Sequence, residues 1–181
     1  MPIENQTTAD YDGQHTIIVG DVNTGKTRLT ETILTAWTRQ RKTRTMAVLD
    51  LAPVTGGLIG GRLSIPTGFQ GVYRSAPVVP PRLRARTEEE ADDLAATNAR
   101  TIENLFQELF AVDRTILVIN DVTLYLQAGN YDRLRELIQP IRTVLINAYY
   151  GHSFPDYRLS RRERRLTDRL IGECQRVIRL P

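Results

Sequence analysis

An eight-residue turn with two glycines most constrains the fold of this 181-residue chain, because it stands between a strand pattern and a helix pattern. Residues 16–19 read Thr-Ile-Ile-Val, a β-branched run typical of a buried strand. From residue 26 the apolar residues recur at spacings of three and four, which predicts an amphipathic helix to about residue 40. Further apolar runs alternate with helical patterns along the chain, which predicts an α/β fold with a mostly parallel sheet.

The turn, residues 20–27, reads Gly-Asp-Val-Asn-Thr-Gly-Lys-Thr and matches G-x-x-x-x-G-K-[ST] at every fixed position. Its glycines let the backbone N–H groups face inward and hold phosphate oxygens, and the following helix directs its positive end at the same place. With this motif in its strand–helix context, the chain resembles the P-loop NTPase superfamily. The resemblance assigns nucleotide binding to Gly20, Asp21, Val22, Asn23, Thr24, Gly25, Lys26 and Thr27.

The resemblance also implies the chemistry of the last two positions. Lys26 would neutralise the β- and γ-phosphates, and the Thr27 hydroxyl would ligate Mg²⁺. The chain has only two lysines, Lys26 and Lys42, against 22 arginines, so a lysine at the fixed position favours this role over a chance match. The expected cofactors are Mg²⁺ and ATP. GTP is the alternative nucleotide, although the guanine-specific pattern N-K-x-D is absent.

An acidic residue at the end of a second apolar strand is the other mark of the superfamily. The run 116–119 is followed by Asn120 and Asp121, and we assign Asp121 to the metal because a carboxylate offsets its charge better than an amide does. Asn120 is the alternative residue for the metal position. The alternative role of Asp121 is to cap the segment that follows it. No Glu follows Asp121, so the water-activating Glu of strong ATPases is missing there.

Asp50 ends the apolar run 45–49 and is a second acidic candidate. Ligands of doubly wound sheets lie beyond the carboxyl ends of the strands, so Asp50 is expected near Asp121 and the turn. In P-loop kinases an acid in this region orients or deprotonates the acceptor hydroxyl, which makes Asp50 a catalytic candidate. A loop-start Asp that accepts local N–H groups is the alternative.

The segment 51–81 holds 6 of the 12 glycines and 5 of the 9 prolines and has no periodicity, as functional or disordered loops do. The chain thereby resembles small P-loop kinases, in which an acceptor-binding insertion follows the second strand and an arginine lid follows the fourth. That layout implies a five-stranded sheet in the order 2-3-1-4-5, flanked by helices. It places Arg158, Arg161 and Arg162 over the phosphates. Fainter similarities to polynucleotide 5′-hydroxyl kinases and to corrinoid adenosyl-transferring enzymes lack parts of those families' motifs.

Two further regions have open interpretations. Asn147 follows the fourth expected strand, residues 142–146, at a position where many superfamily members contact the nucleotide base. Tyr149 and Tyr150 after it either stack on that base or pack on the sheet. An arginine-rich helix is expected over about 160–173, and residues 158–179 carry eight arginines against three acids. Three interpretations of this helix are open: a solvated face with Glu–Arg pairs, a lid over the phosphates, or a nucleic-acid patch. No aromatic residues interleave with its arginines, which counts against the nucleic-acid patch.

The organisation expected is a flexible leader over 1–14 and a single domain over 15–181. One cysteine and no apolar run of eighteen residues fit a cytoplasmic protein without a membrane span. The function expected is a Mg²⁺-dependent, ATP-binding phosphotransferase or NTP hydrolase with an unidentified substrate, phosphate-bearing or nucleic acid. The alternative is a nucleotide-dependent regulatory, nucleic-acid-binding or partner-binding module with little turnover.

Overall fold

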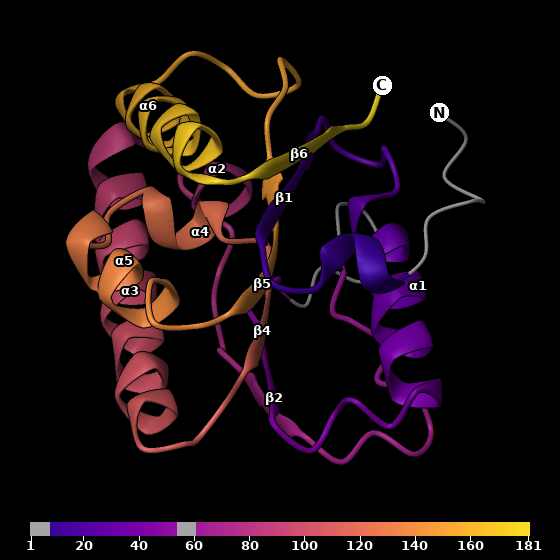
Figure 1. Ribbon diagram of the computed structural model, residues 1–181. Helices are drawn as coiled ribbons and strands as arrows, with labels where there is room; N and C mark the ends of the chain where they lie inside the picture. The colour runs from indigo at the N-terminus through magenta and orange to yellow at the C-terminus, as the bar shows by residue number, and fades with distance from the viewer. Residues whose placement is uncertain (1–7, 54–60) are drawn as a thin grey trace.

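The computed structural model describes residues 8–53 and 61–181, which form one parallel sheet between two helical layers (Figure 1). The strands are β1 His15–Gly20, β2 Met46–Asp50, β3 Val72–Ser75, β4 Ile116–Asn120, β5 Thr143–Tyr149 and β6 Arg176–Arg179. The helices are α1 Lys26–Arg39, α2 Pro81–Arg84, α3 Glu88–Phe110, α4 Thr123–Leu126, α5 Tyr131–Ile138 and α6 Arg158–Glu173. A short 3-10 helix, η2 Thr8–Tyr11, precedes them.

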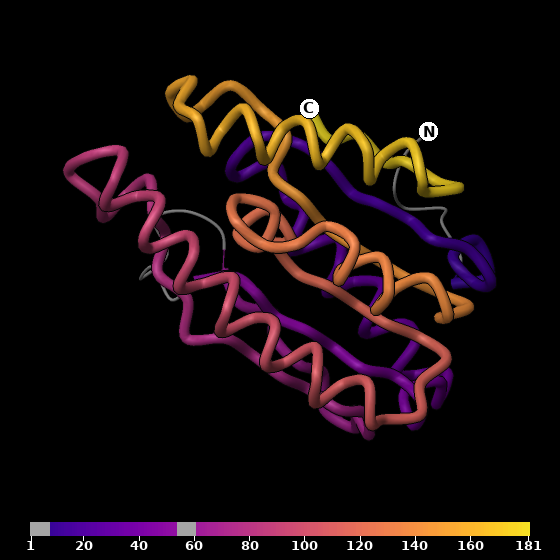
Figure 2. Tube along the Cα trace, turned by 90° about the vertical axis from the view of Figure 1, so that its left-hand side faces the viewer, coloured from indigo at the N-terminus to yellow at the C-terminus, as the bar shows by residue number. Residues whose placement is uncertain are grey.

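Both faces of the sheet are covered, and this accounts for the continuous apolar runs of the strands. Every residue of β2 and of β4 is buried, as expected where helices cover a parallel sheet on both sides. One face packs against α1 and η2, whereas α2 to α6 cover the other face. Figure 2 shows α3, α5 and α6 side by side on this second face. The expected three-layer α/β fold is therefore confirmed.

The sheet differs from the expected one in its strand count and order. It has six strands, in the order β3-β2-β4-β5-β1-β6, because part of the segment 51–81 pairs with β2 as a parallel edge strand. The first and third expected strands, at 16–19 and 116–119, correspond to β1 and β4. The order 2-3-1-4-5 placed these two strands side by side, but β5 lies between them. Fully buried apolar runs look alike in sequence and carry no information on their neighbours, which explains the error.

The strand order determines where the two predicted phosphate-site segments lie. The glycine turn follows β1, and Asp121 follows β4. Because β5 intervenes, their strands are two spacings apart, or roughly 10 Å. The end of β5, where Asn147 lies, is therefore between them.

Part of the expected leader belongs to the folded domain. Tyr11 is 2% exposed and its ring meets the buried Trp37 edge-on, at 6.2 Å between centroids. The Thr8 hydroxyl donates a hydrogen bond to Gln40 at the end of α1. The helix η2 therefore packs against α1, a contact that polar composition does not predict. Residues 1–7 lie outside the described residues.

Within residues 8–53 and 61–181, none of the helices combines the length and the hydrophobicity that crossing a membrane requires.

Two phenylalanines one helical turn apart on α3 test the packing of the second face. Phe106 is 1% exposed and packs on Tyr125, whereas Phe110 is 42% exposed. We expect Phe106→Ala to lower the free energy of unfolding by about 3–5 kcal/mol, since it leaves a cavity. Phe110→Ala should change it by less than about 0.5 kcal/mol, measured by urea denaturation. Equal losses in the two variants would contradict this packing.

Candidate functional site

A cavity of about 440 Å³ lies at the carboxyl edge of the sheet, where the glycine turn meets elements from the second helical layer. The turn and the start of α1 contribute Val22, Asn23, Gly25, Lys26 and Thr27. Other walls are formed by Arg82, Asp121, Gln127, Tyr149, Phe154 and Glu163. Five of the eight positions of the turn thus face the same cavity as the predicted metal carboxylate.

The turn depends on its two glycines for different reasons. Gly25 has a φ of +89°, a left-handed conformation that strains other residues, and α1 begins immediately after it. Gly20 has no room for a side chain, because a Cβ there would lie 2.7 Å from the Thr24 hydroxyl and 3.0 Å from the carbonyl of Leu180. Both fixed glycines of the motif are therefore required by the backbone that is observed.

Asp21 anchors the turn instead of lining the cavity. Its carboxylate accepts hydrogen bonds from the amides of Val22 at 2.6 Å and of His152 at 3.0 Å. Burial acts to raise its pKa, but the hydrogen bonds from Ser153, His152 and Val22 and the charge of Lys26 together lower the pKa to about 2. Asp21 therefore holds the turn against the segment that follows β5, and it stays ionised.

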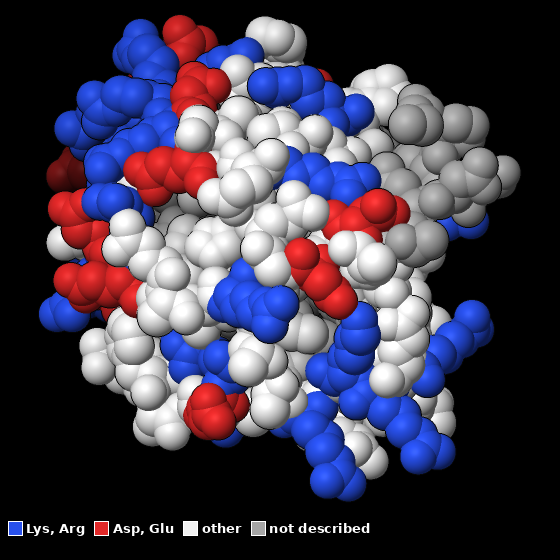
Figure 3. Space-filling model, viewed as in Figure 1, with Lys and Arg blue, Asp and Glu red and all other residues white. Residues whose placement is uncertain are grey.

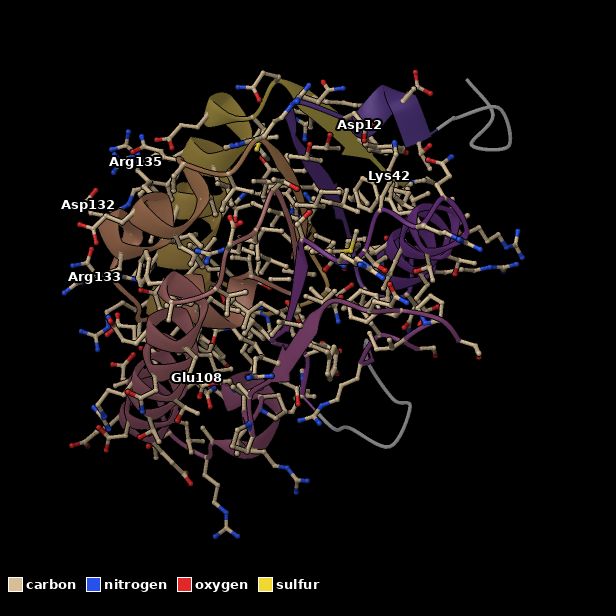
Figure 4. The ribbon with its side chains drawn as sticks, turned by 60° about the horizontal axis from the view of Figure 1, so that its bottom comes forward. Asp12, Lys42, Glu108, Asp132, Arg133 and Arg135 are labelled. Atoms are coloured by element: carbon tan, nitrogen blue, oxygen red, sulfur yellow. The ribbon has the colours of Figure 1, made fainter. Side chains whose placement is uncertain are left out.

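Lys26 reaches into the space between the turn and β4. Its Nζ donates a hydrogen bond to the carbonyl of Asp21 at 2.5 Å. Burial lowers the pKa of Lys26, and the charges of Asp121 and Asp21 oppose that shift. The other lysine, Lys42, lies beyond the opposite end of α1 and pairs with Asp12 at 2.6 Å (Figure 4). Of the two lysines, only Lys26 is placed to act in the cavity.

Asp121 faces the cavity, whereas Asn120 does not. Asp121 has a φ of +56°, which turns the chain after β4, and its carboxylate accepts a hydrogen bond from Thr123. Burial raises its pKa, whereas Thr123, Lys26 and Arg82 lower it. Asn120 is 1% exposed and lies outside the cavity wall. The geometry therefore favours Asp121 over Asn120 as a metal ligand.

The donors at this point suit a magnesium ion that is shared with phosphates. The Thr27 hydroxyl and the Asp121 carboxylate line the same cavity, and no cluster of three or more His, Cys, Asp or Glu with metal-binding geometry occurs among the described residues. Mg²⁺ commonly takes one or two carboxylates and completes its octahedron with phosphate oxygens and water. Such a sparse oxygen set fits that mode of binding better than a dedicated protein cage.

Asn147 is buried and does not line the cavity. Its amide nitrogen donates to the Thr30 hydroxyl at 3.0 Å and to the side-chain oxygen of Asn120 at 2.7 Å. Its own oxygen accepts the backbone N–H of Asp121 at 2.8 Å. All its hydrogen-bonding groups are therefore engaged, which does not support the predicted contact with the base. Asn147 instead joins α1 to the end of β4.

Asp50 continues this buried polar chain. It is 0% exposed, and one carboxylate oxygen accepts from Asn120 at 2.7 Å. The other accepts from the amide of Leu63 at 2.7 Å and from the hydroxyl of Tyr73 at 3.0 Å, and Asp50 does not line the cavity. Burial, followed by the charge of Asp50, raises the pKa of Tyr73 to about 12. This arrangement favours the loop-organising interpretation of Asp50 over the catalytic one.

The arginines of the predicted lid do not line the cavity. Arg158 and Arg161 are largely exposed and pair with Asp92 and Asp156. The guanidinium of Arg162 donates to the carbonyls of residues 126 and 129, at 2.6 and 2.9 Å, near the end of α4. Figure 3 shows basic residues gathered over α6 with acidic residues among them. None of the three lines the cavity, and each has partners elsewhere, so their placement over the phosphates stays a prediction.

Sequence reasoning missed Arg82, an arginine that lines the cavity. Arg82 of α2 forms an ion pair with Glu163 of α6, and their side chains are only 7% and 3% exposed. Gln127 donates to the same Glu163 oxygen at 2.8 Å. One signal was present, because Glu163 falls between Leu159 and Leu166 on the apolar face of its helix. An acid at such a position predicts a buried, paired carboxylate.

Comparisons with known proteins support the fold and nothing finer. Neither a protein-family model nor a curated protein matches the chain. Among solved structures, the crystal structure of the flagellar accessory protein FlaH from Methanocaldococcus jannaschii is similar, with a TM-score of 0.51 and 9% identity. The match covers 98% of this chain and 74% of FlaH. The chain has a P-loop NTPase fold. At this identity, the likeness carries no activity or substrate from one protein to the other.

The low pKa of Asp21 makes its contribution to stability depend on pH. A carboxylate whose pKa falls from 3.8 in the unfolded chain to about 2 when folded stabilises the fold above pH 3.8, and this is lost as the pH falls towards 2. We therefore expect Asp21→Asn to melt at a lower temperature than the wild type at pH 6. The difference between the two melting temperatures should be smaller at pH 3. Thermal melts that give the same difference at both pH values would contradict this linkage.

Asp50→Asn separates the organising role from a catalytic one. In the variant an NH₂ group faces hydrogen-bond donors in place of a carboxylate oxygen, so at least one buried donor loses its acceptor. The free energy of unfolding should therefore fall by about 1.5–3 kcal/mol. Asp132→Asn, on the exposed side of α5, is the matched control and should unfold like the wild type. Intact stability with lost turnover in Asp50→Asn would instead identify Asp50 as catalytic. Denaturant unfolding and phosphate release measure the two properties.

Proposed function

We propose that this protein binds a nucleoside triphosphate with Mg²⁺ and hydrolyses its terminal phosphate. One observation carries the proposal: Lys26, Thr27 and Asp121 line the same cavity at the carboxyl edge of the sheet. They come from two elements separated by about ninety residues of sequence, so a chance glycine turn does not explain their convergence. ATP is the expected nucleotide, with GTP as the alternative.

Each of the three side chains has a distinct task in this proposal. Lys26 carries the positive charge that offsets the β- and γ-phosphates, while the amides of the turn hold their oxygens. Thr27 and Asp121 would hold Mg²⁺, which supplies further charge neutralisation for the departing diphosphate. Phosphoryl transfer depends mainly on positioning and on charge neutralisation, and these residues serve both.

Hydrolysis is favoured over transfer to a bound acceptor because the kinase-like features are weakened. The strand order departs from the kinase-type layout, and the FlaH-like fold is of the RecA-like P-loop kind. Arg158, Arg161 and Arg162 lie elsewhere, and residues 72–75 of the supposed acceptor loop are an edge strand. Asp50, the expected acceptor base, has both oxygens occupied.

A second candidate is a nucleotide-dependent regulatory module with little turnover. Its specific support is that the acids in the described cavity wall already have partners. Asp121 accepts from Thr123, Glu163 pairs with Arg82, and Glu31 accepts from the amide of Ser64 at 2.7 Å. Without a free carboxylate to take the proton of the attacking water, hydrolysis would be slow. Turnover, measured on the same samples as affinity, distinguishes the two candidates.

The two lysines provide a matched test. Lys26→Ala should weaken MgATP binding at least about tenfold, or about 1.4 kcal/mol, with unchanged unfolding. Lys42→Ala removes the same charge far from the cavity and should bind as the wild type does. Calorimetry measures the affinity, and ³¹P NMR of MgATP follows the products. Inorganic phosphate with ADP indicates hydrolysis, and an unchanged spectrum with tight binding indicates the regulatory module. Wild-type affinity in Lys26→Ala would refute the proposal.

A further inference from the structure

The part of the cavity wall formed by α2 and α6 contains a buried charge pair that the proposed function does not use. Arg82 and Glu163 belong to α2 and α6, and both line the cavity. The guanidinium carbon of Arg82 lies 4.6 Å from the centre of the Phe154 ring and 5.4 Å from that of Tyr149. These aromatic contacts hold the guanidinium in one place.

The hydrogen bonding of this wall is incomplete within the described part of the chain. Arg82 Nε and Gln127 Oε1 are buried and have no partner there. Buried polar groups are normally satisfied, and exceptions next to a cavity point to a ligand. An unused guanidinium N–H beside a cavity is a donor available to an anion. This observation is independent of the phosphate-binding motif.

Arg82 is held rigidly at its backbone as well. The side chain of Asn98 on α3 accepts the N–H of Val79 at 3.0 Å and donates to its carbonyl at 2.7 Å. These two bonds fix the segment that leads into α2. Arg82 therefore approaches the cavity from a fixed element and needs no closing lid to reach it.

The position of Arg82 selects the kind of anion. Lys26, Arg82 and Asp121 line the same cavity, and both cations lower the pKa of Asp121, so both lie near the predicted metal carboxylate. A planar guanidinium matches phosphate oxygens with two parallel hydrogen bonds. If the turn holds the β-phosphate, the terminal phosphate of a triphosphate extends beyond the turn into the cavity that Arg82 lines.

We propose that Arg82 binds the terminal phosphate and exchanges Glu163 for it, so that the site distinguishes a triphosphate from a diphosphate. This inference rests on the proposed function. Glu163 remains bonded to Gln127, which follows α4, when Arg82 leaves it. The exchange therefore changes the link between α2 and α6 only while the triphosphate is bound.

The experiment compares affinities for a non-hydrolysable MgATP analogue and for MgADP. Arg82→Gln should weaken the triphosphate analogue at least about tenfold and change MgADP by less than about twofold. Glu163→Gln frees Arg82, so triphosphate affinity should rise while MgADP affinity stays the same. Arg161→Gln removes a charge from the exposed side of α6 and should change neither.

A double variant covers the case in which a single change leaves a buried charge unpaired and prevents folding. Arg82→Met with Glu163→Gln is neutral at both positions and should bind MgADP like the wild type while losing the preference for triphosphate. A wild-type preference in this variant, with Lys26→Ala still defective, would overturn the role of Arg82 and leave the proposed function intact. An equal loss of affinity for the triphosphate analogue in Arg82→Gln and Glu163→Gln would also overturn the role of Arg82. Absence of nucleotide binding by the wild type would overturn both proposals.

Discussion

The side-chain amide of Asn147 is the interaction on which the geometry of the cavity depends. It bonds Thr30 of α1, the side chain of Asn120 and the backbone N–H of Asp121. The helix that presents Lys26 and the strand end that presents Asp121 are thereby tied to one buried group. Inside a protein such a network is rigid when all its members are satisfied, because any broken bond leaves a polar group without water. The cavity is consequently held open by polar bonds beneath it.

This arrangement is a consequence of the strand order. If β1 lay next to β4, the turn and Asp121 would be one strand spacing apart and no side chain could stand between them. With β5 in between, its last residues provide the bridge, and Asn147 occupies that position. The same polar chain then runs through Asn120 to Asp50, which holds the start of the next loop. Sheet topology thus determines which residues support the site and which can line it.

The parts of the site that were predictable from the sequence are those whose chemistry is local. The turn at 20–27 and Asp121 were identifiable because their motif and neighbouring strands are contiguous. The roles of Asn147 and Asp50 were not, since an amide or a carboxylate at a strand end looks the same whether it faces a ligand or a neighbouring strand. The contacts of Arg162 were not predictable either, because its partners are backbone carbonyls that no sequence pattern displays.

The contrast between the faces of α6 shows why charge counts mislead in this chain. Its exposed arginines pair with nearby acids in water, where such pairs contribute little to stability. On its buried face Glu163 forms an ion pair with Arg82 in the cavity wall. A buried ion pair is commonly no more stabilising than a well-packed apolar pair. Stability alone therefore does not account for a buried pair beside a cavity. A ligand that competes for Arg82 gives the pair a role, because the free energy of desolvating the arginine has already been spent when the ligand arrives.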